Sequence, residues 1–130
     1  MRGIKFRAWD KNTKEWYLDK KQGLVVGLYG DITNCWNGEL MDDYTDRIIL
    51  LQYTGLKDKN GVEIYEGDIL ETDKGYIQKV EHITETIDGT TYVSGFYAWD
   101  EEKHTWMAID NTDKIIGNIY KNPELLEAKK

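Results

Sequence analysis

The sequence contains a single cysteine, a single proline and a single serine in 130 residues. One cysteine excludes an internal disulfide framework and any zinc site built on several thiolates, so the fold must be held by its core. No apolar run approaches the roughly 20 residues that a membrane-spanning helix needs, and no signal-peptide apolar stretch follows Met1. These absences predict a cytoplasmic protein without a membrane partner.

Recognisable catalytic and metal-binding motifs are also missing. Cys35, His82 and His104 stand in no nucleophile or metal motif, and no phosphate loop or dinucleotide fingerprint occurs. The stretch Asp58–Gly61 resembles half a calcium loop but lacks the distant bidentate glutamate, which favours a plain hairpin turn. We therefore expect no enzyme activity, no catalytic residue, no metal and no cofactor. A hydrolase that uses Cys35 or acidic residues is a third alternative, without a nominated substrate.

Positive charge is scarce overall and unevenly spread. The net charge is -7 and the sequence pI is about 4.8, but residues 1–30 carry a net +4 and residues 31–130 a net -11. An acidic protein repels phosphates, which disfavours nucleic-acid binding. The alternative is that single-stranded nucleic acid stacks on Trp9 and Trp16 beside the basic residues of the first 21. The charge split itself favours head-to-tail association of copies.

Large aromatic rings and glycines are abundant, with five Trp, nine Tyr and 12 Gly. This composition predicts antiparallel strands joined by glycine turns at Asn37-Gly38, Asn60-Gly61, Lys74-Gly75 and Asp88-Gly89. The strands are expected at 4–9, 15–18, 24–29, 48–53, 68–72, 76–86, 91–99, 105–109 and 114–119.

Two further segments need separate arguments. Tyr76, Val80, Ile83 and Ile87 fall at helical spacing, but the stretch is rich in β-branched residues and bounded by glycines, which favours a strand. In the tail, Asn122 as N-cap and Pro123 at the first helical position predict a short helix.

One pattern occurs twice, 90 residues apart. Its copies are Phe6, Ala8, Trp9, Asp10 and Trp16, and then Phe96, Ala98, Trp99, Asp100 and Trp106. In each, an aromatic strand enters a polar stretch and returns on a tryptophan, as in a hairpin. We interpret the copies as two similar turns in which an aspartate accepts backbone hydrogen bonds and the tryptophans cover core, rather than as a duplicated functional site.

Three ordered segments resemble one known family. Residues 52–69 read Gln-Tyr-Thr-Gly-Leu-Lys-Asp-Lys-Asn-Gly-Val-Glu-Ile-Tyr-Glu-Gly-Asp-Ile, flanked by Lys-Phe-Arg-Ala-Trp-Asp at 5–10 and Ile-Gly-Asn-Ile-Tyr-Lys-Asn-Pro-Glu-Leu-Leu at 116–126. These segments resemble the YopX family of bacteriophage and prophage proteins. The resemblance implies a carboxy-terminal SH3-like β-barrel, an origin in a bacterial cytoplasm and no established biochemical function. Residues 19–47 match no family pattern.

The composition predicts a mainly β protein, and together with the resemblance it implies three parts. Residues 1–51 form an amino-terminal β-hairpin region, 52–122 an SH3-like β-barrel and 123–130 a short helix. The expected function is a non-enzymatic protein–protein interaction module that self-associates and binds a phage or host protein. The candidate contact surface comprises Arg2, Lys5, Arg7, Lys57, Asp58 and Lys59.

Overall fold

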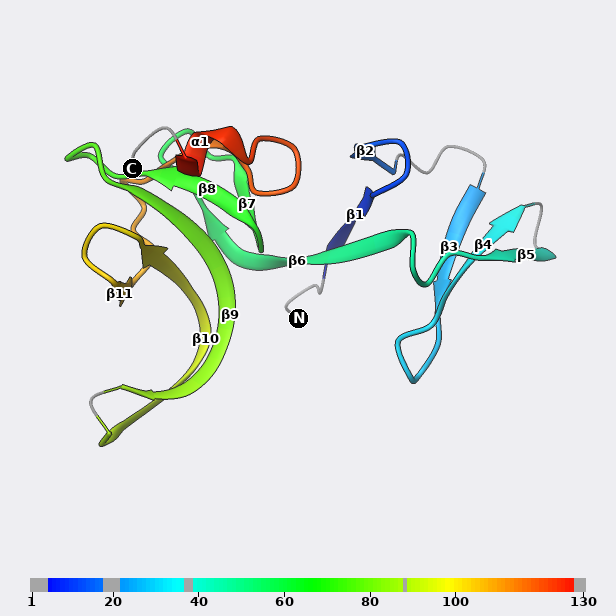
Figure 1. Cartoon of the computed structure of the whole chain (residues 1–130), viewed down its shortest axis with the longest axis horizontal. Coiled ribbons are helices and arrows are strands. Elements are labelled where there is room, and N and C mark those ends of the chain that lie inside the picture. Colours follow the sequence, from blue (N-terminus) through cyan, green and yellow to red (C-terminus); the bar gives the residue numbers. More distant parts are fainter. Residues whose placement is uncertain (1–4, 18–21, 37–38, 88, 128–130) are drawn as a thin grey trace. The chain divides into compact units, whose positions relative to one another are not determined.

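The computed structural model describes residues 5–17, 22–36, 39–87 and 89–127 (Figure 1). Strands predominate, and one short helix lies near the end of the chain. The elements are β1 (Phe6–Asp10), β2 (Glu15–Trp16), β3 (Gln22–Val26), β4 (Ile32–Trp36), β5 (Glu39–Asp43), β6 (Ile48–Lys57), β7 (Glu63–Tyr65), β8 (Asp68–Glu71), β9 (Ile77–Ile87), β10 (Thr91–Asp100), β11 (Thr105–Met107), β12 (Lys114–Asn118) and α1 (Glu124–Glu127). The predicted β class and the short carboxy-terminal helix are confirmed.

The chain divides into two compact units. The small unit is Phe6–Leu51, and the large unit consists of Met1–Lys5 together with Gln52–Lys130. Strand β6 crosses the boundary, because its residues 48–51 belong to the small unit and its residues 52–57 to the large one.

The small unit contains the β1–β2 hairpin, which lies beside β6 in a sheet of the order β2-β1-β6-β7, and a three-stranded sheet. Strands β1 and β2 pair with Trp9 opposite Trp16, and the antiparallel sheet has the order β3-β4-β5. Its core is formed by buried Ala8, Ile32 and Ile48, against which Tyr17, Leu24, Tyr44 and Leu50 pack half-buried. Aromatic rings and branched side chains therefore fill the interior, as the composition predicts.

The large unit contains a five-stranded sheet in the order β11-β10-β9-β8-β12. Strands β9 and β10 pair without interruption, from Gln78 opposite Asp100 to Ile87 opposite Thr91. The segment 77–87, whose apolar spacing also suited a helix, is therefore a strand. Ile64, Leu70 and Val80 are fully buried, with Ile109 and Ile115 packed against them. As far as the described residues go, this sheet curves into half a barrel (Figure 1). The closed SH3-like barrel is not confirmed.

The repeated pattern forms two turns with the same geometry. Asp10 Oδ1 accepts hydrogen bonds from the N–H groups of residues 12 and 13 at 2.9 and 3.3 Å. Asp100 Oδ1 does the same for residues 102 and 103 at 3.0 and 3.1 Å. Each turn ends in a left-handed residue, Lys14 (φ 58°) or His104 (φ 51°). The tryptophan rings stack edge-to-face at 5.0 and 4.9 Å, so the reading as two similar turns is confirmed.

The main differences from the expected strands lie between residues 24 and 43. The expected strand 24–29 ends at Val26, because Gly27 and Gly30 (φ +85°) close a turn over residues 27–30. Strands β4, β5 and β7 were not predicted. The sequences of β4 and β5 carry Asn and Asp residues that have little preference for strands, so pairing with neighbours decides their structure. The Asn37-Gly38 turn lies outside the described residues.

Candidate interaction surface

Two of the predicted contact residues are engaged inside their own units. Lys5 Nζ lies 2.6 Å from Glu63 Oε2 and 5.4 Å from the centre of the Tyr53 ring. The hydrogen bond to Glu63 raises the pKa of Lys5. In the small unit, the Arg7 guanidinium lies 4.1 Å from the centre of the Trp16 ring. Lys5 and Arg7 therefore already have partners within the chain. Arg2 lies outside the described residues.

The loop Lys57–Lys59 presents its two lysines but not its aspartate. Both lysines are exposed, whereas Asp58 is buried. Asp58 Oδ1 accepts from the N–H groups of Asn60 and Val62 at 2.8 and 2.9 Å, and Oδ2 accepts from Ile115 N at 3.1 Å. Burial would raise the pKa of Asp58, but these donors outweigh it and hold the pKa below its ordinary value. The aspartate organises the turn, and only Lys57 and Lys59 can meet a partner.

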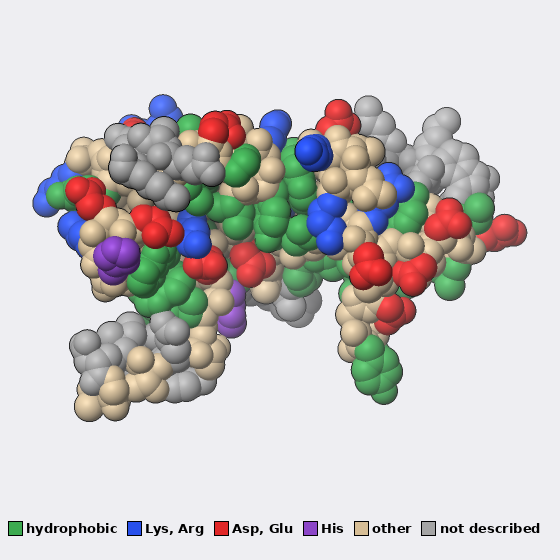
Figure 2. Space-filling view, in the orientation of Figure 1, with side chains coloured by type: hydrophobic (Ala, Val, Ile, Leu, Met, Phe, Trp, Pro, Cys, Tyr) green, Lys and Arg blue, Asp and Glu red, His purple; other side chains and the backbone are tan. Residues whose placement is uncertain are grey.

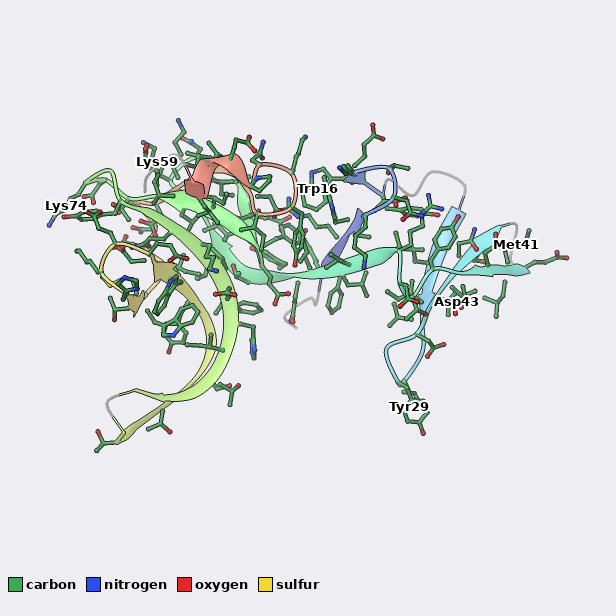
Figure 3. All side chains as sticks on the ribbon, in the orientation of Figure 1. Trp16, Tyr29, Met41, Asp43, Lys59 and Lys74 are labelled. Atoms are coloured by element: carbon green, nitrogen blue, oxygen red, sulfur yellow. The ribbon has the colours of Figure 1, made fainter. Side chains whose placement is uncertain are left out.

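The three-stranded sheet carries an apolar surface that the sequence analysis missed. Six of the nine exposed large apolar side chains among the described residues lie on it. We call them the apolar patch: Val25, Val26, Leu28, Tyr29, Leu40 and Met41. Leu28 is 100% and Tyr29 98% exposed, at the tip of the β3–β4 turn. Figure 3 shows Tyr29 pointing away from the sheet, and Figure 2 shows an apolar protrusion at the same place.

Strand register explains why part of this patch is uncovered. Leu24 lies opposite Asn34 and Val26 opposite Ile32, and Leu24 and Ile32 take part in the core. Side chains alternate between the two faces of a sheet, so Val25, opposite Thr33, lies on the outer face. Leu40 joins that face because it lies opposite Cys35. Val25 and Leu40 therefore lie on the face away from the core, whereas Val26 shares the core-side face with Leu24 and Ile32 and is nevertheless half exposed.

Acidic side chains accompany the apolar patch. Residues 22–46 contain five carboxylates and no lysine or arginine: Asp31, Glu39, Asp42, Asp43 and Asp46. The Asp43 carboxylate accepts hydrogen bonds from the hydroxyl and N–H of Thr45 at 2.5 and 2.9 Å. These bonds lower the pKa of Asp43. The stretch that carries the patch is thus rich in carboxylates and contains no lysine or arginine.

The remaining reactive groups do not assemble into a site. No cluster of three or more His, Cys, Asp or Glu residues in the described ranges could hold a metal ion. Cys35 is half-buried in β4. Asp113 is buried, which raises its pKa, and its Oδ2 accepts from Asp110 N at 2.9 Å in a turn. No helix in the described part of the chain is long and apolar enough to cross a membrane.

The solved structures that are similar to this chain include two proteins from bacteria. Protein EF1440 from Enterococcus faecalis is 27% identical, with 95% of this chain and 97% of that chain covered and a TM-score of 0.52. Protein yopX from Bacillus subtilis is 23% identical, with 92% and 95% covered and a TM-score of 0.56. The second likeness shows the fold alone. No curated protein matches the chain.

The sequence profile described as YopX protein matches residues 5–127. This match spans both units and includes all three segments that carry the resemblance in sequence, from Lys5 to Leu126. The chain therefore belongs to the YopX family.

Proposed function

We propose that this protein is a non-enzymatic protein–protein interaction module of a bacteriophage or prophage, acting in the bacterial cytoplasm, that associates with its own copies and binds a phage or host protein. The observation that carries the proposal is the apolar patch. Monomeric soluble proteins rarely expose contiguous apolar patches larger than a few hundred Å², and larger ones mark interaction sites. Four of its six side chains lie on the paired strands β3 and β5, which give a partner a rigid surface to bind.

Burial of the patch against a partner favours association. Covering apolar surface gains about 25 cal/mol per Å² removed from water, and Leu28 and Tyr29 alone are almost completely exposed. The charge split between residues 1–30 and 31–130 contributes less, because Lys5 and Arg7 already have partners within their own units. Association through the patch should therefore persist when salt screens surface charges.

Sedimentation velocity with matched variants tests the proposal. The wild-type chain should associate at about 100 μM, where interactions of micromolar affinity are populated, in both low and high salt. Leu28→Ser/Tyr29→Ser should weaken association. The control Leu56→Ser/Val62→Ser changes two other exposed apolar residues, 44% and 52% exposed, in the large unit, and should leave association unchanged. A wild-type chain that is monomeric in every condition would remove self-association from the proposal.

Single-stranded nucleic-acid binding by the β1–β2 hairpin is the alternative function. Lys11 and Lys14 are exposed in its turn. Trp9, however, is only 4% exposed, and the Arg7 guanidinium lies over the Trp16 ring. A base needs a free aromatic face to stack on, so the hairpin offers charge without a stacking surface. We favour the protein-interaction module for this reason.

A further inference from the structure

Strand β3 lies at an edge of the three-stranded sheet. The order is β3-β4-β5, so β4 is the one hydrogen-bonded neighbour of β3 in the part of the chain that the structure describes. An edge strand carries a row of backbone donors and acceptors that can pair with a strand of another chain. Proteins usually protect such edges with charges, prolines or bulges.

Hydrogen bonds in the turn show which residues of β3 face outward. Gly27 N donates to Asp31 O at 2.8 Å, so Gly27 points its backbone groups toward β4. In antiparallel pairing such residues alternate along the strand. Gly23 and Val25 therefore also face β4, and Gln22, Leu24 and Val26 direct their N–H and C=O groups outward. The neighbouring strand agrees, because Ile32, opposite Val26, accepts from Tyr44 N at 2.7 Å on its other side.

The two edges of this sheet differ in protection. Strand β5 contains Glu39, Asp42 and Asp43 within five residues. Strand β3 has no charged residue, and the uncharged sequence continues through residue 30. Like charges that face each other across paired strands are destabilising, so β5 resists pairing with a copy of itself and β3 does not.

We propose that two copies of the chain pair β3 with β3 in antiparallel orientation around a two-fold axis at Leu24. The proposal rests on the self-association proposed above and adds a backbone contact at the edge of the sheet that carries the apolar patch, while Val25 and Leu40 stay on the exposed outer face. In this register Leu24 faces Leu24 of the partner subunit, and Gln22 faces Val26 of the partner subunit. All these residues direct their backbone groups outward, so each facing pair exchanges two N–H···O=C bonds.

Side-chain sizes suit the same register. Val25 then lies opposite Gly23 of the partner subunit, in a position where antiparallel strands bring Cα atoms to about 4.5 Å. A glycine leaves room for the branched side chain at this close approach. The pairing also extends the outer face of the sheet, with Val25 and Leu40, into one apolar surface across the axis.

Pairing with a second copy accounts for both edges of the sheet, the uncharged β3 edge and the acidic β5 edge. The joined sheet has the order β5-β4-β3-β3-β4-β5, so both uncharged edges are used and both remaining edges carry three carboxylates. A two-fold contact is self-complementary and closes after two subunits. The charged β5 edges then oppose further growth, which makes a dimer the expected assembly.

Blocking the outward N–H of Val26 tests the pairing. Val26 is half exposed and its N–H faces away from β4, so Val26→Pro removes an outward donor and spares the β3–β4 ladder. The matched control Val26→Ala shortens the same side chain but keeps the N–H. In sedimentation velocity, the dimer dissociation constant should rise at least about tenfold in Val26→Pro and less than about threefold in Val26→Ala. Far-UV circular dichroism checks that both variants fold.

A crosslinking experiment tests the register independently. Cys35 lies opposite Gly23 within the chain, so Cys35→Ser is the background. Gly23→Cys and Val25→Cys chains are oxidised separately and then as a mixture. The Cα separation of about 4.5 Å suits a disulfide, so the mixture should form more crosslinked dimer than either chain alone. Equal crosslinking by Val25→Cys alone would overturn the register.

The outcomes separate this proposal from the proposed function. A wild-type dimer that Val26→Pro leaves intact, with no crosslink in the mixture, overturns the β3 pairing but leaves self-association standing. A wild-type chain that stays monomeric overturns both, whether or not β3 accepts a strand from a different protein. A dimer that is lost in Val26→Pro, kept in Val26→Ala and crosslinked in the mixture supports both.

Discussion

Arg47 holds Asp10 through two of its guanidinium nitrogens. Nε lies 3.0 Å from both carboxylate oxygens of Asp10, and Nη2 lies 2.7 Å from Oδ2. The aspartate side chain is 4% exposed, and the hydrogen bond from Arg47 lowers its pKa. Asp100, the equivalent residue of the second turn, is also buried, but its Oδ2 has no hydrogen-bond partner among the described residues. The two turns share one local geometry and differ in this tertiary contact.

The contrast predicts unequal costs for the same substitution. Asp10→Asn removes the ion pair with Arg47 and should lower the free energy of unfolding by about 2–3 kcal/mol. Asp100→Asn keeps Oδ1 as acceptor for the turn and should cost less than about 1 kcal/mol. Urea unfolding followed by tryptophan fluorescence measures both. Equal losses would contradict the role given to Arg47.

Stability should fall in acid as buried carboxylates become protonated. The pKa values of Asp10 and Asp58 are lowered in the folded chain, so each contributes stability above its ordinary pKa near 4. That contribution is lost as the pH falls through the folded pKa. Urea midpoints should therefore decrease below about pH 4. In Asp58→Asn this decrease should be smaller, because that variant has one carboxylate fewer to protonate, and an unchanged pH profile would contradict the prediction.

Gly117 sits too close to the carboxy-terminal turn to carry a side chain. A Cβ there would lie 2.6 Å from Leu125 Cδ1 and 2.8 Å from Asn122 Oδ1. Asn122 Oδ1 accepts from Asn118 N at 3.2 Å, so displacement of Asn122 also disturbs that bond. Gly117→Ala should cost about 1–3 kcal/mol in urea unfolding. In a Leu125→Ala background the cost should be smaller, and full additivity would show that Leu125 is not the obstacle.

Oligonucleotide binding distinguishes the two candidate functions. Labelled single strands titrated at about 50 mM salt should leave tryptophan fluorescence unchanged, because Trp9 is buried and Arg7 lies over Trp16. A basic single-stranded DNA-binding protein serves as positive control. Quenching that weakens steeply as the salt concentration rises would instead support the nucleic-acid alternative.

The hydrogen bonds and glycine positions of several turns could be predicted from the sequence alone. The shared spacing of Asp10 and Asp100 correctly indicated aspartates that accept hydrogen bonds from the following N–H groups. Asn60-Gly61 and Lys74-Gly75 also form turns with glycine at positive φ. These features depend on a few consecutive residues, so the sequence contains the information that specifies them.

The apolar patch could not be placed in the same way. Nine uncharged residues from Gln22 to Gly30 were a signal, but such a run reads equally as a buried strand. Its exposure follows from the turn at residues 27–30 and from the pairing of β4 with β5. The Asp and Asn residues in those strands give no strong preference for strands.

The amino-acid sequence by itself determined the β class, the turns at Asp10, Asn60-Gly61, Lys74-Gly75 and Asp100, and the carboxy-terminal helix, because each depends on local backbone preferences and side-chain spacing. Only the tertiary structure decided that Asp10 pairs with Arg47 whereas Oδ2 of Asp100 has no hydrogen-bond partner among the described residues. It also decided that β3 lies at the edge of its sheet. Both depend on which distant segments meet. That choice is made by the burial of Ala8, Ile32 and Ile48 in a common core, which no short stretch of sequence specifies.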